Sequence, residues 1–242
     1  MKVAFTLAYN GTHFLGSQTQ RESNNTILGN VTQVFKALGI TDKIVASGRT
    51  DKGVHATGQV CHIELPEYWS DLKKLQRAVN KMFPSSILLK NIKPVDETFH
   101  ARYSAKRRVY RYIIKTCQSN PFEADFVTFF PTADMQSVFE NIGLFEGRHD
   151  FSSFMKTGSD VGSTERIIYK AFAYKHKEHY VLYFEANGFL RSQIRLMVGA
   201  LLQLNAVQIA EKLSHKKEHK VRPAPPNGLY LAKIKYESRN YL

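Results

Sequence analysis

The chain has 242 residues, of which 43% are hydrophobic and 23% are charged, a composition typical of globular proteins that bury a core. Its 34 lysines and arginines exceed its 21 aspartates and glutamates by 13, which favours a polyanionic partner such as nucleic acid over an ordinary basic surface. The sequence contains no apolar run of 18 residues, which argues against a membrane partner, and Cys61 and Cys117 form no C-x-x-C motif, so we expect a reduced, cytoplasmic location.

The first hundred residues alternate between strand and helix patterns. Apolar residues at every second position predict a strand over residues 3–8, and strands are also expected at 43–47, 58–65 and 86–95. Apolar residues at helical spacing predict helices over 27–38 and 72–82. The order strand, helix, strand, strand, helix, strand is that of a ferredoxin-like split βαβ unit.

A glycine-rich polar loop from Ala46 to Val60 joins two of these strands. It contains one carboxylate, Asp51, between the cations Arg49 and Lys52. Cations on both sides favour the ionised carboxylate, and an isolated ionised aspartate suits a nucleophile or an electrostatic stabiliser better than a general acid. The alternative is that Asp51 caps a turn and pairs with Arg49 at the surface.

A basic strand opens the second half of the chain. Cations alternate there with Tyr110 and Tyr112, and the alternation places Arg111 on the face opposite these tyrosines. Cations for phosphates beside aromatic rings for bases are the composition of an RNA surface, although a solvated basic edge strand is the alternative. The cations of this segment are Lys106, Arg107, Arg108 and Arg111.

The rest of the chain repeats the first pattern. A hairpin is expected over residues 165–175 and 180–186, with its turn near Lys177, and a helix that is mostly apolar is expected from Phe189. Arg191 and Arg195 would lie one turn apart on this helix, either at a functional site or in a structural ion pair. A short helix over 206–213 and a terminal strand follow.

At least five ordered segments of the chain resemble the tRNA pseudouridine synthase A (TruA) family. The most specific is the loop Gly48-Arg-Thr-Asp-Lys-Gly-Val-His-Ala-Thr-Gly-Gln-Val60. Two segments depart from the family pattern, because Asn10 and Ser17 stand where the family has aspartate and tryptophan, and Ser192-Gln193 stand where it usually has His-Met. The other similar segments are Tyr9–Gln18, Phe99–Tyr112, Gly147–Phe154, Asn187–Leu202 and Gly228–Leu231.

The resemblance implies a fold, a reaction and a set of site residues. The fold would be α+β, with two ferredoxin-like halves (1–103 and 104–242) that form a mixed, mostly antiparallel sheet around a central RNA-binding cleft. The reaction would be the isomerisation of uridine to pseudouridine in the anticodon arm of tRNA, at positions of about 38 to 40, by a homodimer without cofactor or metal. Asp51 would be the catalytic residue, with Arg191 paired to it, and Tyr110 would contact the substrate. The further substrate-binding candidates are Arg49, Lys106, Arg107, Arg108 and Arg195.

Two other functions are compatible with parts of the sequence. A basic RNA-binding protein could use the same surface without catalysis, whereas a phosphate-hydrolysing enzyme is disfavoured because the chain lacks clustered carboxylates for a metal. The segment His215-Lys-Lys-Glu-His219 fits the pattern H-x-x-E-H of some zinc peptidases. It lies in a lysine-rich stretch just before several prolines, which favours a solvated basic loop instead.

Overall fold

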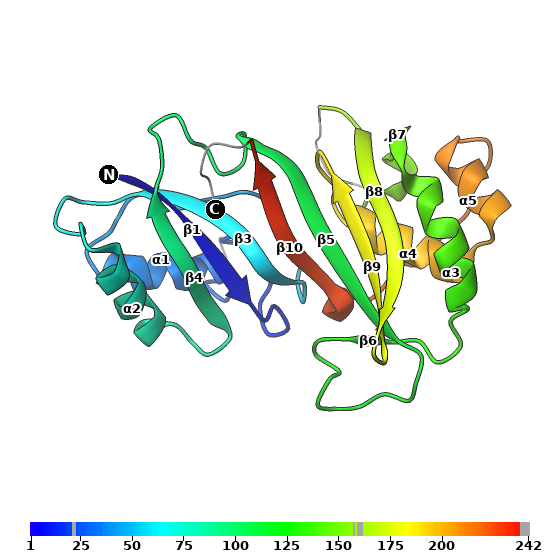
Figure 1. Cartoon of the computed structure of the whole chain (residues 1–242), viewed down its shortest axis with the longest axis horizontal. Helices are drawn as coiled ribbons and strands as arrows, with labels where there is room; N and C mark the ends of the chain where they lie inside the picture. Colours follow the sequence, from blue (N-terminus) through cyan, green and yellow to red (C-terminus); the bar gives the residue numbers. More distant parts are fainter. Residues whose placement is uncertain (21–22, 157, 159–161, 238–242) are drawn as a thin grey trace. The chain divides into compact units, whose positions relative to one another are not determined.

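The chain divides into two compact units in its computed structural model, which describes residues 1–20, 23–156, 158 and 162–237. The first unit comprises Met1–Lys106 together with the C-terminal segment from Tyr230, and the second is Arg107–Leu229. In each unit, helices pack on one face of a sheet (Figure 1). The predicted α+β class with mostly antiparallel strands is therefore confirmed.

The first unit has the predicted order strand, helix, strand, strand, helix, strand. Its strands lie in the spatial order β4–β1–β3–β2, with antiparallel neighbours, as in a split βαβ unit. Its elements are β1 (Lys2–Tyr9), α1 (Ile27–Ala37), β2 (Val45–Ala46), β3 (His55–Glu64), α2 (Leu72–Met82), β4 (Ile87–Pro94) and, except for its first residue, β10 (Leu229–Tyr236).

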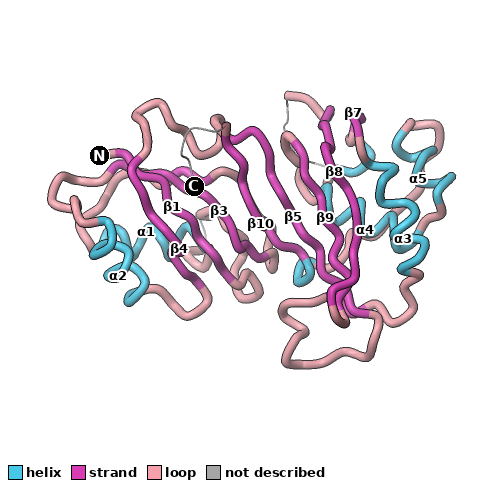
Figure 2. The backbone as a smooth tube through the Cα atoms, viewed as in Figure 1, coloured by secondary structure: helices cyan, strands magenta, loops and turns pink. Residues whose placement is uncertain are grey.

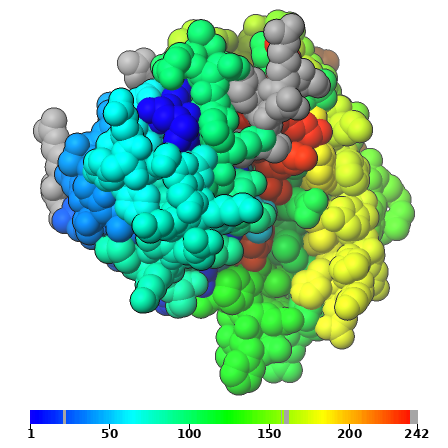
Figure 3. Space-filling model, turned by 60° about the vertical axis from the view of Figure 1, so that its left-hand side comes forward, coloured from blue at the N-terminus to red at the C-terminus, as the bar shows by residue number. Residues whose placement is uncertain are grey.

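The core of the first unit lies between β1 and the helices. Phe5 of β1 is fully buried and stacks on Phe35 of α1, with ring centroids 5.3 Å apart. The side chain of Thr26 caps α1 by accepting a hydrogen bond from the Gly29 amide, which fixes the start of the helix. In Figure 3 the segment between β2 and β4 forms much of the near surface of this unit.

The second unit repeats part of this pattern and adds short elements. Its strands β5, β9, β8 and β7 pair in that order and are antiparallel, while β6 is parallel to β5. Figure 2 shows the long strands in magenta and the helices in cyan. The elements are β5 (Ala105–Lys115, which begins at the end of the first unit), β6 (Thr128–Phe129), α3 (Met135–Asn141), β7 (Gly147–Asp150), β8 (Glu165–His176), β9 (His179–Ala186), α4 (Gln193–Gln203) and α5 (Ala206–Leu213), with 3-10 turns at Ile142–Phe145, Ser152–Phe154 and Pro226–Gly228.

Several predicted boundaries are confirmed and two are wrong. The hairpin turns at Lys177, whose φ of 55° is left-handed, and the short helix α5 spans 206–213 as expected. The helix expected from Phe189 begins only at Gln193, because Ser192 has a left-handed φ of 59° that interrupts a helical path. Strand β3 begins at His55, three residues earlier than predicted.

The two compact units do not follow the predicted domain boundary in one respect, because the C-terminal strand groups with the N-terminal residues. Strand β10 groups with the first unit, where Tyr230 and Leu231 lie beside His55 and Ala56 of β3 in parallel register. Whether 1–103 and 104–242 behave as separate domains stays a prediction.

Candidate functional site

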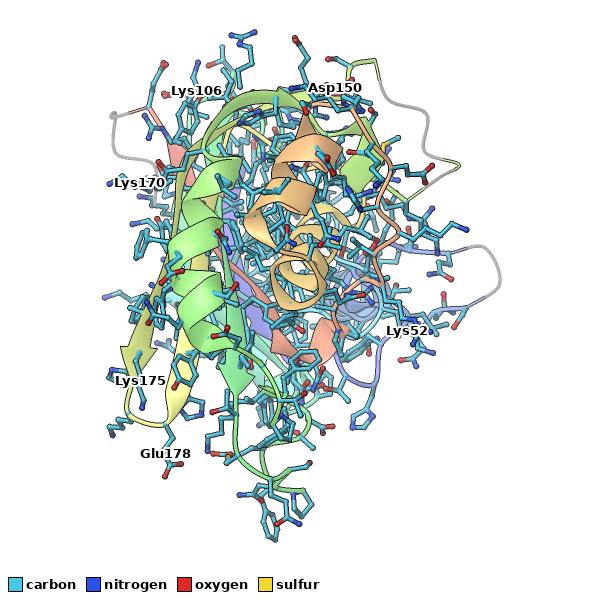
Figure 4. All side chains as sticks on the ribbon, turned by 90° about the vertical axis from the view of Figure 1, so that its right-hand side faces the viewer. Lys52, Lys106, Asp150, Lys170, Lys175 and Glu178 are labelled. Atoms are coloured by element: carbon cyan, nitrogen blue, oxygen red, sulfur yellow. The ribbon has the colours of Figure 1, made fainter. Side chains whose placement is uncertain are left out.

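The loop that carries Asp51 spans residues 47–54, between β2 and β3. The Val54 amide donates to the Asp51 carbonyl at 3.1 Å, and Gly53 supplies the φ of 78° that this tight turn requires. The Asp51 residue is half-buried, whereas Arg49 and Lys52 are exposed, and Lys52 lies at the surface in Figure 4. Asp51, the one acidic residue of this loop, is therefore partly exposed to solvent.

Hydrogen bonds with two buried residues of β3 fix the start of this loop. The Ser47 amide donates to the Val60 carbonyl at 2.8 Å, and the side-chain amide of Gln59 donates to the Gly48 carbonyl at 2.6 Å. Gln59 is 1% exposed, so its side chain is a fixed support. Thr50, two residues after Gly48, is also buried, and it forms hydrogen bonds with Ser17 and Tyr9.

A second turn supports the end of the loop. The Gly11 amide donates to Nδ1 of His55 at 3.1 Å, and a Cβ at position 11 would lie 2.0 Å from the Val54 carbonyl oxygen. Only glycine permits so close an approach of the two backbones. The buried ring of His55 stacks on Tyr230 at 4.7 Å, and burial raises the pKa of Tyr230 well above its usual range.

The basic strand divides its cations between two faces of the second unit's sheet. Arg111 lies opposite Tyr183 in the register of β5 and β9, while Tyr110 lies opposite the buried Phe184 on the other face. Tyr112 shares the face of Tyr110 and is fully buried. The prediction from alternation is thus confirmed: Arg111 lies on one face of the sheet, and Tyr110 and Tyr112 lie on the other.

Arg107 is engaged in a network on the same face as Arg111. Its Nη1 lies 2.9 Å from Oε1 of Glu185, which is almost fully buried, and its guanidinium lies 4.2 Å from the ring centroid of Tyr169. The Tyr183 hydroxyl donates to the other oxygen of Glu185 at 2.8 Å. Burial and this carboxylate raise the pKa of Tyr183 to about 12. Arg107 therefore neutralises a buried acid, whatever else it binds.

Tyr110 contacts the segment that leads to Arg191. Its ring meets that of Phe189 edge to face at 5.3 Å, and Nη1 of Arg108 donates to the Asn187 carbonyl at 2.7 Å. Lys106 forms an exposed ion pair with Glu237 in the first unit. The structure thus brings Tyr110, Arg108 and the segment before Arg191 together within the second unit.

Arg191 lies in a tight turn before α4 and not on the helix. The Gln193 amide donates to the Leu190 carbonyl at 3.1 Å, and the Leu190 amide donates to the Gln193 side chain at 2.8 Å. The Arg191 carbonyl accepts from the Lys156 amide at 3.1 Å, while Arg191 itself is exposed. The expectation that Arg191 and Arg195 lie one turn apart on the same helix is therefore wrong.

Arg195 has a structural partner within the second unit. Its Nε donates to the Ala224 carbonyl at 2.6 Å, and the Ala224 amide donates back to the Arg195 carbonyl at 2.8 Å. Arg195 also lies near Tyr112, whose pKa burial raises well above its usual range. Arg195 fastens the connector before β10 to α4, and its substrate-binding role stays a prediction.

The histidines of the H-x-x-E-H segment face different carboxylates. Nε2 of His215 lies 3.6 Å from Asp150, whereas Nε2 of His219 lies 2.7 Å from Glu211. Over the described ranges, no group of three His, Cys, Asp or Glu residues is arranged to hold a metal ion. No helix in the described part of the chain is long and apolar enough to cross a membrane.

Sequence reasoning missed the residues that support the Asp51 loop. Tyr9, Gln59 and His55 are buried polar residues of strands, for which the sequence pattern gave no separate signal. Ser17 was visible only as a departure from a family pattern. Asp51 and Arg191 lie in different units, so their expected pairing stays a prediction.

The chain is similar to known proteins over nearly its whole length. A family model described as tRNA pseudouridine synthase matches residues 6–104 and 142–237. A protein of Campylobacter jejuni (strain RM1221) named tRNA pseudouridine synthase A is 38% identical over 241 residues, which cover 98% of this chain and all of the relative. Proteins of the same name from Geobacillus sp. (strain WCH70) and Helicobacter hepaticus are 36% and 34% identical, over 98% and 95% of this chain and 99% and 97% of their own lengths.

A likeness to a solved structure is much weaker. A chain in the crystal structure of a Cbf5-Nop10-Gar1 complex is 15% identical, with a TM-score of 0.35 over 83% of this chain and 45% of that chain. The relation to the sequence family does not depend on it.

Proposed function

Because the chain belongs to the tRNA pseudouridine synthase family, we propose that it isomerises uridine to pseudouridine in the anticodon arm of tRNA, at positions of about 38, 39 and 40. The observation that carries the proposal is Asp51, a half-buried carboxylate in a loop that matches the family signature and is fixed at both ends. The fixed backbone supports a catalytic role, because a reacting group must be held in one geometry.

The reaction breaks the bond between N1 of uracil and C1′ of ribose and rejoins the base through C5. A proton leaves C5 and one returns to N1, so no electrons are gained or lost overall. The target base is stacked in the anticodon arm, so the enzyme must turn it out of the stack before it reacts.

We assign the catalytic step to Asp51. Its carboxylate attacks the ribose or the uracil, or removes a sugar proton while it stabilises positive charge at C1′; the residues around Asp51 are compatible with each of these routes. In all three routes the ionised carboxylate is the reacting group.

Tyr110 and Arg191, the other residues proposed to act at the reacting base, lie on β5 and before α4 in the second unit. Tyr110 would pack on the base that leaves the stack, and Arg191 would orient and stabilise the Asp51 carboxylate. The edge-to-face contact of Tyr110 with Phe189 supports a fixed ring that can present one side to a base. The RNA backbone would be held by Arg49, Lys106, Arg107, Arg108 and Arg195.

We also propose that the protein acts as a cytoplasmic homodimer, as its family resemblance implies. Light scattering from the purified protein at micromolar concentration tests this, and a mass near 27.7 kDa, that of one chain, would contradict it. Fractionation of cells that express the protein tests the location.

Release of tritium from tRNA tests the reaction directly. Protein is incubated with tRNA that carries [5-³H]uridine, and wild type is compared with Asp51→Asn, which keeps the shape of the side chain but removes its charge. We expect release by wild type, a loss of at least about 1,000-fold in rate for Asp51→Asn, and unchanged tRNA binding, because the anion is needed only for the chemistry.

The same experiment separates the proposal from its main alternative. Binding without release by wild type would favour an RNA-binding protein without this activity. Release by Asp51→Asn at the wild-type rate would remove Asp51 from catalysis. Mapping of the product by chemical modification of pseudouridine then tests positions 38 to 40.

A further inference from the structure

The residue before Asp51 is held by two side chains from other elements. The Thr50 amide donates to the Ser17 hydroxyl at 2.8 Å, and the Ser17 amide donates to the Thr50 carbonyl at 3.0 Å. The Thr50 hydroxyl lies 2.8 Å from the hydroxyl of Tyr9. Both backbone polar groups of Thr50 and its side chain are thus engaged, and all three residues are at most 7% exposed.

The elements that provide these contacts are themselves fixed. Tyr9 is the last residue of β1, the strand that pairs with both β3 and β4. The Ser17 carbonyl accepts from the Leu28 amide at 2.9 Å, in the first turn of α1. Thr50, the residue before Asp51, therefore contacts Tyr9 at the end of a sheet strand and Ser17, which is bonded to the first turn of a helix.

Gly16 makes the contact between the two segments possible. Its φ is 112°, and a Cβ there would lie 3.0 Å from the Thr50 carbonyl oxygen. A side chain at position 16 would strain the backbone and crowd the carbonyl that Ser17 binds. The sequence Gly16-Ser17 is thus matched to a close approach of this loop to Thr50.

We propose that Ser17 and Tyr9 are positioning residues of the isomerase, and that they direct the Asp51 carboxylate by fixing the backbone at Thr50. The proposal rests on the proposed function, in which Asp51 is the catalytic residue. Ser17 meets the Thr50 backbone with a small hydroxyl, which accepts from the Thr50 amide.

A positioning role predicts a loss in turnover rather than in binding. A displacement of about 1 Å in a reacting group can lower a rate by ~100-fold, whereas most of the cations proposed to hold the tRNA backbone lie outside this loop. Ser17→Ala removes the hydroxyl that accepts from the Thr50 amide. We therefore expect kcat to fall about 10- to 100-fold, with KM and the Kd for tRNA within about twofold of wild type.

The test compares Ser17→Ala, Tyr9→Phe and the double variant in the tritium assay. Tyr9→Phe keeps the ring and removes only the hydroxyl, so it is the variant less prone to misfold. Because both side chains act on Thr50, the double variant should lose less than the product of the two single losses. Circular dichroism melting records the stability of each variant.

Ser153→Ala in the second unit is the matched control. The Ser153 hydroxyl donates to the Lys212 carbonyl at 3.1 Å, so this variant also loses one side-chain hydrogen bond. We expect a similar fall in melting temperature but wild-type kcat. The proposal is overturned if Ser17→Ala and Tyr9→Phe both keep wild-type kcat, or if kcat and melting temperature fall in the same proportion in all three single variants.

Failure of this proposal is distinguishable from failure of the proposed function. Release by wild type, none by Asp51→Asn and wild-type rates for both positioning variants would leave Asp51 catalytic and overturn only the role of Ser17 and Tyr9. No release by wild type would overturn the proposed function and this inference together.

Discussion

Arg191 illustrates how a single residue is placed by its neighbours' backbone. The left-handed Ser192 and the paired hydrogen bonds between Leu190 and Gln193 fix the turn that carries it. The side chain remains exposed. A fixed backbone with an exposed guanidinium suits a residue that meets a ligand or a carboxylate, and it suits a buried structural ion pair less well.

Arg191→Lys tests that role. Lysine keeps the charge but loses the planar fork that can hold a carboxylate with two hydrogen bonds, so we expect kcat to fall about 10- to 100-fold. The measurement is single-turnover tritium release with saturating enzyme. Arg148→Lys is the control, because Arg148 forms an exposed ion pair with Glu165, at 3.8 Å. Equal rates for both variants would assign Arg191 a structural role.

The sequence could predict the roles of single residues only where a local pattern points to them. Asp51 was singled out by the resemblance of its loop to a family signature, because a carboxylate between two cations was equally compatible with a surface turn, and alternation placed Arg111 on the face opposite Tyr110. The sequence could not indicate that Arg107 bonds Glu185, 78 positions later in the chain. Such contacts depend on strand register, which local patterns do not specify.

At the scale of elements, glycines decide how closely strands approach. Gly58 of β3 lies against β10, and a Cβ there would be 2.3 Å from the Ala232 carbonyl oxygen. A backbone atom cannot turn aside as a flexible side chain does, so the strands would have to separate.

Gly58→Ala should therefore destabilise the first unit. We expect the free energy of unfolding to fall by about 1–3 kcal/mol or more, because overpacking costs are of this size. Urea unfolding followed by Trp69 fluorescence measures it, since Trp69 is the only tryptophan and donates to the Leu38 carbonyl within this unit. Gly143→Ala, whose Cβ would meet nothing within 4 Å, should leave the midpoint unchanged. A midpoint for Gly58→Ala equal to wild type would contradict the argument.

Element type was more predictable than element length. Periodicity located α1, α2, α5 and the β8–β9 hairpin, because apolar residues recur along each at the period of its secondary structure. The start of α4 was missed because Phe189 and Leu190 extend the apolar pattern of the helix, while the turn is set by the Gln193 side chain and by Ser192. β2 is two residues long because only Val45 and Ala46 pair with β3.

At the scale of the whole molecule, the excess of 13 positive charges governs the encounter with RNA. Binding that neutralises phosphates releases counterions, so affinity falls as salt rises. We expect the Kd for tRNA to increase about 10-fold or more between 50 and 200 mM KCl, measured by filter binding. Melting curves in the same buffers serve as the control for folding. A Kd that does not change with salt would contradict binding through the phosphate backbone.

The membership of β10 in the first unit has a consequence for how the protein is made. Thr57 of β3 and Ala232 of β10 are hydrogen-bonded although 175 positions separate them in the chain. On a ribosome, the strand that follows the Asp51 loop emerges long before its partner is translated. A nascent chain that stops before Tyr230 would contain every proposed catalytic residue and still lack the ring that stacks on His55. The chain must therefore be translated through β10 before Tyr230 can stack on His55, the residue that begins β3 directly after the Asp51 loop.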